Sequence, residues 1–162
     1  MTNQGNTMNL KKLFIATLSV FVLSTSLYAE TLQEKNKKLV VDFYELAFNK
    51  HKPTEAAKKY IGNKYIQHNP HVPNGAEAFY NYFEGHFKKN PESHVIIKRA
   101  LADGDLVALH LHSKENKADL GRAIVDIFRV ENGKIVEHFD VVQEVPAKTA
   151  NGNTMFEGDK EN

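Results

Sequence analysis

The chain has 162 residues, with 21 Lys and Arg against 20 Asp and Glu, and a formal net charge of +1 at pH 7. This balance excludes the large basic field that nucleic-acid binding requires, so we expect no nucleic-acid partner. The chain contains no cysteine, which excludes disulfides and a lipidated N-terminal Cys. Its stability must therefore come from packing.

Residues 1–29 have the layout of a secretory signal peptide. Lys11 and Lys12 form a basic region, residues 13–23 are an apolar run, and small residues lead to Ala29. The apolar run is too short to span a bilayer comfortably, so a retained membrane anchor is the weaker alternative. We expect cleavage after Ala29. The mature protein should then be periplasmic or secreted and should not be bound to the membrane.

The first half of the remaining chain is helical in character. Apolar residues at spacings of three and four predict a helix over residues 31–49 with one apolar stripe. Pro53 suits a first helical position and Gly62 a C-terminal stop. Together they predict a short second helix over residues 54–61.

A third helix and two strands follow. Asn74 and Glu77 resemble a capping box, and the helix that they begin should end before Pro91. Beyond it the pattern changes to period two with β-branched residues. This change predicts strands over residues 95–101 and 106–113, joined by an Asp-Gly turn.

A β-hairpin is the strongest local signal in the chain. Two alternating runs, residues 122–130 and 134–143, flank Asn132 and Gly133. Asn-Gly favours a tight turn because both central residues need positive φ. Asp126 lies among apolar neighbours in the first run, and an ionised carboxylate there is costly unless it is paired or faces a polar pocket. We interpret it as the first sign of a site.

Helices followed by antiparallel strands indicate an α+β domain, which we place at residues 30–145. A strongly curved sheet wrapped over a long helix would enclose a pocket, with residues 65–68 at its rim or floor. The remaining residues, 146–162, are rich in Asn, Gly, Lys and Thr. We expect this tail to be mobile or to dock loosely.

Histidines and aspartates share strand faces. His110 and His112 lie two apart and point to one side, and His138 and Asp140 do the same on the last strand. If these faces and that of Asp126 all turn inward, imidazoles and carboxylates converge in an apolar cup suited to acid–base chemistry. The alternative is that the three histidines point outward, because a period-two pattern does not say which face is inside.

A second polar cluster contains His68, Asn69 and His71 in a loop rich in Pro and Gly. A rigid loop is a good mount for a site residue, although surface histidines are the simpler interpretation.

A metal site is a further alternative, because His110 and His112 could offer two imidazoles to one zinc ion. A third ligand would have to come from Asp126, Asp140 or His68. No complete ligand set occurs at a recognisable spacing, so we expect metal to be dispensable and predict no cofactor.

Three segments, residues 65–70, 75–79 and 125–140, together have a familiar pattern. In these segments the chain resembles the SnoaL-like polyketide cyclase family of the nuclear-transport-factor-2-like superfamily, and residues 151–156 are similar to its predicted aldol-condensing branch. Phe139 stands where the family usually has Trp, which keeps an aromatic wall.

This resemblance implies a cone-shaped α+β barrel with a deep apolar cavity, often dimerising through the outer face of the sheet. It also implies proton transfer by a strand His and a strand Asp without metal or organic cofactor. By strand position these fall near His112 and Asp126, with Asp140 as a further carboxylate. The residues expected to bind or orient substrate are His68, Asn69, His110, Phe128 and His138.

Two functions remain open at this level. One is a cofactor-free lyase or isomerase that removes a proton next to a carbonyl of a small apolar compound. The other is an exported protein that only binds such a compound. Export favours the second, and a costly carboxylate in an apolar strand favours the first.

Overall fold

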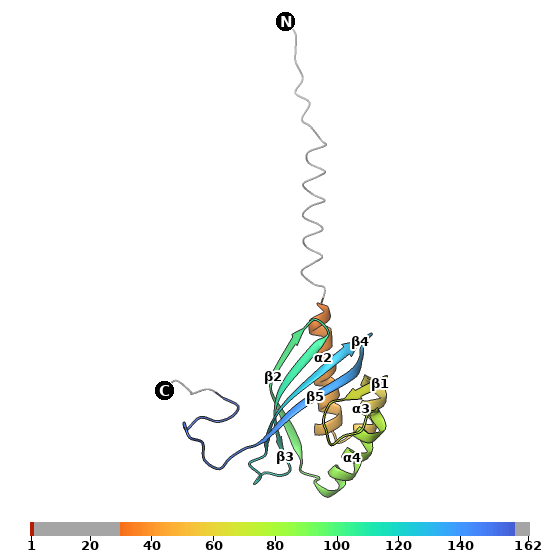
Figure 1. The fold of residues 1–162 in the computed structure, drawn as a ribbon. Coiled ribbons are helices and arrows are strands. Elements are labelled where there is room, and N and C mark those ends of the chain that lie inside the picture. Colours follow the sequence, from red (N-terminus) through yellow and green to blue (C-terminus); the bar gives the residue numbers. More distant parts are fainter. Residues whose placement is uncertain (2–29, 158–162) are drawn as a thin grey trace. The chain divides into compact units, whose positions relative to one another are not determined.

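The computed structural model describes residue 1 and residues 30–157, and the expected signal peptide lies outside the described residues. Residues 32–157 make up one compact unit, drawn in colour in Figure 1. Within the described part of the chain, no helix has the length and apolar character needed to cross a membrane.

Helices precede most of the sheet. The helices are α2 (Leu32–Tyr44), the π-helix η1 (Glu45–Asn49), α3 (Pro53–Tyr60) and α4 (Ala76–Lys89). The strands are β1 (Ile61–Gln67), β2 (His94–Asp103), β3 (Leu106–Lys114), β4 (Arg122–Glu131) and β5 (Lys134–Glu144). The predicted helices and the four predicted strands are all present, and β1 is an additional strand.

The long first helix is confirmed, and its last turn is wider than an α-helix. Its apolar stripe buries Val40, Phe43, Tyr44 and Ala47. From Glu45 the chain continues as a π-helix, a form that is rare and often found at functional sites. The widened turn lies where the helix borders the cavity described below.

Two predicted helix boundaries are wrong. Gly62 does not stop α3, because the helix ends at Tyr60 and Gly62 already belongs to β1. Asn74 does not cap α4, since the N-cap residue is Gly75 and the Asn74 side chain accepts a hydrogen bond from the backbone of Gln67. At both helix boundaries β1 overrides the local sequence signal: Gly62 is part of this strand, and Asn74 is bonded to its last residue, Gln67.

The sheet has the order β1-β5-β4-β3-β2, with β1 parallel to β5 and the other neighbours antiparallel. The β4–β5 hairpin turns at Asn132 and Gly133, whose φ angles of 51° and 72° confirm the predicted turn. The helices gather on one side of the sheet in Figure 1. The α+β class is confirmed, with an open, curved sheet whose edges are β1 and β2.

Burial identifies the face of the sheet that meets the helices. Along β3 the buried residues are Val107, Leu109 and Leu111, while His110 is only partly buried. On β4 the buried inward positions include Asp126 and Phe128. The inner face of the sheet therefore carries the core and one carboxylate.

The tail is held more firmly than expected. The Phe156 ring is buried against the outer face, stacked 4.1 Å from His112 and 5.6 Å from His110. Arg99 Nη1 donates to the Phe156 carbonyl at 2.8 Å, and Lys98 forms an ion pair with Glu157 at 2.9 Å. The described end of the tail is thus anchored on β2 and β3.

Candidate active site

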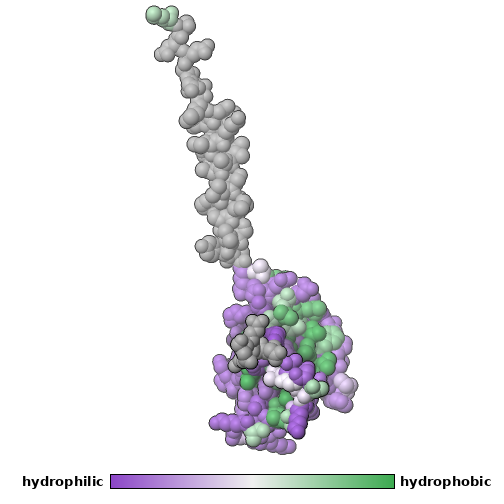
Figure 2. Space-filling model, turned by 90° about the vertical axis from the view of Figure 1, so that its left-hand side faces the viewer, coloured by the Kyte–Doolittle hydropathy of each residue, from purple (hydrophilic) through white to green (hydrophobic). Residues whose placement is uncertain are grey.

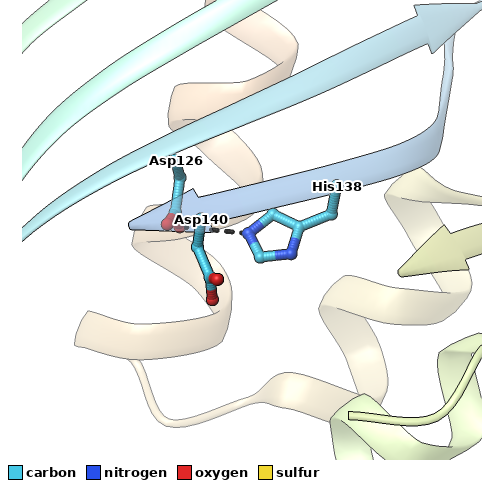
Figure 3. Close-up of side chains that lie close together, drawn as sticks. All are labelled: Asp126, His138 and Asp140. Carbon is cyan, nitrogen blue, oxygen red and sulfur yellow. Dashed lines mark ion pairs between the residues drawn. The ribbon is translucent and has the colours of Figure 1, made fainter. Parts of the chain in front are cut away.

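Asp126, His138 and Asp140 project from β4 and β5 into the interior (Figure 3). Asp126 lies opposite Asp140 in the register of the two strands, and His138 lies opposite Phe128. Their ligating atoms all lie within 4.8 Å of one another. Asp126 is 4% exposed and His138 is 8% exposed, so these polar groups must be satisfied by the protein or by a ligand.

Asp126 is satisfied by two partners. The Tyr44 hydroxyl, from the end of α2, donates a hydrogen bond to Asp126 Oδ2. Burial raises the pKa of Tyr44 well above its usual value, and the Asp126 charge raises it further. Tyr44 therefore stays protonated and acts as a permanent donor. The second partner is His138 Nε2, 3.4 Å from Asp126 Oδ2.

The tautomer of His138 follows from its neighbours. The backbone N–H of Asn69 donates to Gln67 Oε1 at 3.0 Å, which identifies that atom as the amide oxygen. An oxygen can only accept, so His138 Nδ1, 2.7 Å away, carries a proton and donates it. His138 Nε2 and Asp126 Oδ2 then attract each other only when a proton lies between them. At 3.4 Å, the two atoms are placed so that they can share a proton.

Asp140 is oriented by the loop after β1. Asn69 Oδ1 accepts from the backbone N–H of His71 at 2.9 Å, so the Asn69 amide nitrogen points the other way. That nitrogen donates to Asp140 Oδ2 at 2.6 Å. Asp140 is partly buried, and its carboxylate lines the same cavity as Asp126. Asn69 thus holds the Asp140 carboxylate at the cavity.

Tyr65, on β1, completes the polar end of the cavity. Burial raises its pKa, and the charges of Asp126 and Asp140 raise it further, while a hydrogen bond from the Gln67 side chain acts in the opposite direction. Since Gln67 Oε1 is occupied, its NH₂ group is the donor to the phenol oxygen. The Tyr65 O–H remains a donor for a carbonyl oxygen of a ligand.

These groups lie at one end of a cavity of about 470 Å³. This volume suits a small organic molecule. On the helix side the wall is aromatic, and on the sheet side it is made of branched aliphatic residues. Residues of these two walls include Tyr44, Phe48, Phe83, Phe87, Leu111 and Ile124.

The family model for SnoaL-like polyketide cyclases matches residues 38–151. The chain belongs to the SnoaL-like polyketide cyclase family. A comparison with curated protein sequences gives no match.

Solved structures share the SnoaL-like fold. A candidate polyketide cyclase from Bacillus cereus is 22% identical, with a TM-score of 0.58 over 67% of this chain and 74% of that one. A candidate ketosteroid isomerase from Kribbella flavida is 16% identical, with a TM-score of 0.59 over 75% and 87%. AclR, a candidate hydroxylase from Streptomyces galilaeus, is 19% identical, with a TM-score of 0.56 over 69% and 81%. At these identities the likeness concerns the fold alone.

In this SnoaL-like chain the expected residues divide between the two faces of the sheet. Four of them join Asp126 at the cavity: Asn69, Phe128, His138 and Asp140. The expected convergence of His110 and His112 with Asp126 is wrong, because burying Val107, Leu109 and Leu111 turns both histidines outward to the tail. His68 also lies outside, stacked 4.0 Å from Phe139 and bonded to Glu137 at 2.9 Å.

Three side chains that line the cavity, Tyr44, Tyr65 and Gln67, were not among the candidate residues from the sequence. Tyr44 was counted only as part of an apolar stripe, and the partner of Asp126 was expected to be His112 rather than His138. Tyr65 and Gln67 belong to a segment that was expected only to border the pocket. One sequence signal could have identified Tyr44. It is a tyrosine on the core face of a helix, and a buried phenol usually needs a polar partner.

One set of residues in the described chain could hold a metal ion: Asp126, His138 and Asp140. Two carboxylate oxygens and one imidazole nitrogen form a plausible ligand set for a divalent cation. It differs from the His110–His112 pair considered from the sequence. The same three atoms can also share protons, and the proposals below rest on that use.

Proposed function

We propose that this SnoaL-like protein is a cofactor-independent lyase or isomerase that performs enolate or aldol chemistry on a small apolar carbonyl compound. The observation that carries this proposal is the approach of two buried side chains, His138 and Asp126, whose Nε2 and Oδ2 atoms lie 3.4 Å apart next to Asp140 at the cavity. Burying these groups costs several kcal/mol, and a cavity that only held an apolar ligand would not need them.

The chemistry divides between two sets of groups. Asp140 removes a proton from the carbon next to the carbonyl, so that a C–H bond breaks, an O–H bond forms on Asp140 and negative charge moves to the carbonyl oxygen. Tyr65 stabilises that oxygen with a hydrogen bond. Returning the proton to another carbon gives an isomerase, and attack of the enolate on a second carbonyl gives an aldol product.

The role that we propose for Asp126 differs from the one expected from the sequence. The sequence suggested that Asp126 is the principal proton-transfer residue, with His112 as its partner. Its Oδ2 already faces two groups, Tyr44 and His138. We therefore assign Asp126 to hold His138 in position, and Asp140 to act as the base.

Exchange of substrate protons for deuterium tests this proposal. In D₂O the methyl protons of 2-acetylnaphthalene should exchange faster with protein than without it, as followed by ¹H NMR. Asp140→Asn keeps the shape of the side chain and should lower the catalysed rate about 10²–10⁴-fold, the usual contribution of a positioned acid–base group. Asp103→Asn, at the exposed end of β2, should leave it unchanged.

The same assay tests independence from metal. Protein dialysed against EDTA should retain its exchange rate. One stoichiometric zinc ion by elemental analysis, lost in His138→Ala together with activity, would instead establish a metalloenzyme.

The alternative function is non-catalytic binding of a small apolar compound in the same cavity. The signal-peptide layout of residues 1–29 favours it, because polyketide assembly is cytoplasmic. Ligand binding without any exchange catalysis across a panel of aryl ketones would support this alternative.

We also propose that the protein is a homodimer joined through the outer face of the sheet. Val125 and Val141 are neighbours in the β4–β5 register and are 43% and 72% exposed, with the exposed Phe139 nearby. On the face drawn in Figure 2, apolar residues gather in a patch towards the right, beside largely polar surface. Contiguous apolar surface of this kind is typical of an interface.

A further inference from the structure

The cavity is layered along the sheet. Inward-facing positions of β4 pair with inward-facing positions of β5, and each pair forms one layer. From the acid–base groups towards the open end, these pairs are Asp126 with Asp140, Ile124 with Val142, and Arg122 with Glu144. All of these residues except Glu144 line the cavity. An acid–base layer is thus followed by an apolar layer and by an outer polar layer.

The outer polar layer lies well apart from the acid–base layer. Arg122 and Asp126 are four residues apart on β4, or about 13 Å at a strand rise of about 3.3 Å per residue. The Arg122 side chain is 42% exposed, whereas that of Asp126 is 6% exposed. The outer polar layer is therefore at the open end of the cavity, where a bound molecule can reach its side chains.

The apolar layer lies between these two polar layers. On the sheet side, Leu111 pairs with Ile124, and both line the cavity together with Val142. On the helix side Phe48 and Phe83 line it, with their ring centroids 4.8 Å apart. A flat ring system fits between an aromatic and an aliphatic wall. The cavity thus suits a flat molecule with a polar group at each end.

His86, on α4, faces the outer polar layer from the helix side. It is partly buried and lines the cavity. Burial lowers the pKa of His86, the charge of Glu115 raises it, and the charges of Arg122 and His51 lower it. Glu115 is ion-paired with Arg122 at 3.0 Å, so these charges place His86 beside the outer polar layer. Figure 1 shows the end of α4 and the β3–β4 connection at the same end of the sheet. The lowered pKa keeps the His86 ring neutral at pH 7.

The proton of the neutral His86 ring is on Nε2. The side-chain nitrogen of Asn90 donates to the His86 carbonyl at 3.2 Å and lies 3.3 Å from His86 Nδ1. Because a carbonyl oxygen only accepts, this Asn90 atom belongs to the NH₂ group, and Nδ1 must accept from it. Among the described residues, the side-chain hydrogen bonds of His86 involve Nδ1 alone. The Nε2–H group is therefore a donor without a partner, on a partly exposed ring that lines the cavity.

The other polar side chains at this end are less suited to bind a ligand oxygen. Arg122 is already paired with Glu115 and, at 3.5 Å, with Glu144. Two carboxylates and one guanidinium leave an excess of negative charge, which disfavours a carboxylate on the ligand. Ser113 lines the cavity here too, but its hydroxyl can rotate between partners, whereas Asn90 holds the His86 ring in one orientation.

We propose that His86 is a specificity-determining residue, whose Nε2–H binds an uncharged acceptor oxygen at the end of the substrate opposite its reacting carbonyl. This inference rests on the proposed function for the role of the acid–base layer. It defines the substrate class as flat ketones that carry a second oxygen, in an ether or a carbonyl, at the far end of an apolar ring system. An imidazole N–H donates and cannot accept, so this oxygen needs no proton of its own.

Two probes of the same shape test this subsite. In 2-acetyl-6-methoxynaphthalene an ether oxygen stands where 2-acetyl-6-ethylnaphthalene has a CH₂ group. Isothermal titration calorimetry should show that the methoxy probe binds about three- to tenfold more tightly, as expected for one hydrogen bond. Equal affinity of the wild type for the two probes, including no measurable binding of either, would overturn the proposal.

Two conservative variants assign the preference to one nitrogen of His86. His86→Gln brings an amide nitrogen near the position of Nε2 and should retain the preference for the methoxy probe. His86→Asn reaches only the position of Nδ1 and should lose it. Ser113→Ala, at the same end of the cavity, should retain it. Retention in His86→Asn, or loss in Ser113→Ala, would contradict the assignment to His86.

A third probe tests the charge of the distal group. The carboxylate of 6-acetyl-2-naphthoate should bind no more tightly than the ethyl probe, because Glu115 and Glu144 repel it. If the carboxylate bound most tightly of the three, Arg122 rather than His86 would be the recognition group, and the proposal would be wrong.

The outcome is separable from that of the proposed function. Calorimetry requires no turnover, so a preference lost in His86→Asn would establish the subsite even if deuterium exchange were absent. Conversely, exchange lost in Asp140→Asn with no preference between the probes would support the enzyme and refute the subsite.

Discussion

Tyr44 is the residue on which the site depends most directly for its stability. Its hydroxyl joins the helix layer to a carboxylate of the sheet, and both groups are buried. Burial raises the pKa of Tyr44, so the donor does not ionise in the neutral range. When a buried carboxylate loses such a donor, its desolvation is no longer offset by a hydrogen bond, and packing does not compensate for the loss.

Tyr44→Phe should therefore destabilise the protein by about 1–3 kcal/mol, because Asp126 loses a buried hydrogen bond while the ring is kept. Urea unfolding followed by circular dichroism measures this change. Tyr82→Phe removes the same atom from a tyrosine that is 65% exposed and should have no effect. Equal stability of Tyr44→Phe and the wild type would mean that the bond contributes nothing.

At the scale of elements, the two faces of β3 have different structural roles. Its inward residues build the core, and its outward histidines hold the tail. His110 Nδ1 lies 3.0 Å from Arg99 Nη1, which can only donate, so His110 accepts and is neutral at that atom. Burial lowers the pKa of His110, and the charges of Arg99 and Lys98 lower it further. Protonation would remove the acceptor and place a third cation beside these two.

This arrangement predicts a loss of stability in acid. Because the folded pKa of His110 lies below the unfolded value of 6.5, its contribution is complete above about pH 6.5 and is lost as the pH falls through the folded value. The Tm should fall between pH 7.5 and pH 5. The fall should be smaller in His110→Gln, which keeps an acceptor and does not titrate.

His71→Gln, which changes an exposed histidine away from the tail, is the matched control and should retain the wild-type fall. Parallel pH profiles of the wild type and His110→Gln would show that the contact of His110 with the tail is not sensitive to pH. His86, whose pKa is also lowered chiefly by burial, is present in all three proteins and cancels in this comparison.

For the whole molecule, the outer sheet face makes the proposed dimer testable. Val141→Lys places a charge on the most exposed apolar residue of the β4–β5 face and should convert a dimer to a monomer in analytical ultracentrifugation. Leu32→Lys changes an equally prominent apolar residue at the start of α2 and should leave the dimer intact. A monomeric wild type at micromolar concentration would refute the interface.

The location of the protein is also a property of the whole chain. If residues 1–29 are a signal peptide, intact mass spectrometry of the exported protein should give the mass of a chain that begins at Glu30. A membrane-bound product that retains Met1 or Met8 would contradict this prediction.

The sequence alone determined the elements whose signals are local. The apolar stripe of α2 and the Asn132–Gly133 turn depend only on residues close in the chain, and both are present in the structure. The α+β class follows from their order. Asp126 was also singled out from the sequence, because an ionisable group in an apolar strand is costly wherever the strand lies, and it lines the cavity.

Only the tertiary structure decided which residues meet. Alternation along β3 allowed either face to be inside, and packing against the helices chose the face of Leu109 and Leu111, since it buries more apolar surface. That choice moved His112 to the outer face. The register of β4 and β5 and the parallel pairing of β1 then brought His138, Gln67 and Tyr65 to Asp126. The contacts of β1 join segments far apart in the chain, and the β4–β5 register contains a shift between Arg129 and Val130, so the local turn signal did not specify either.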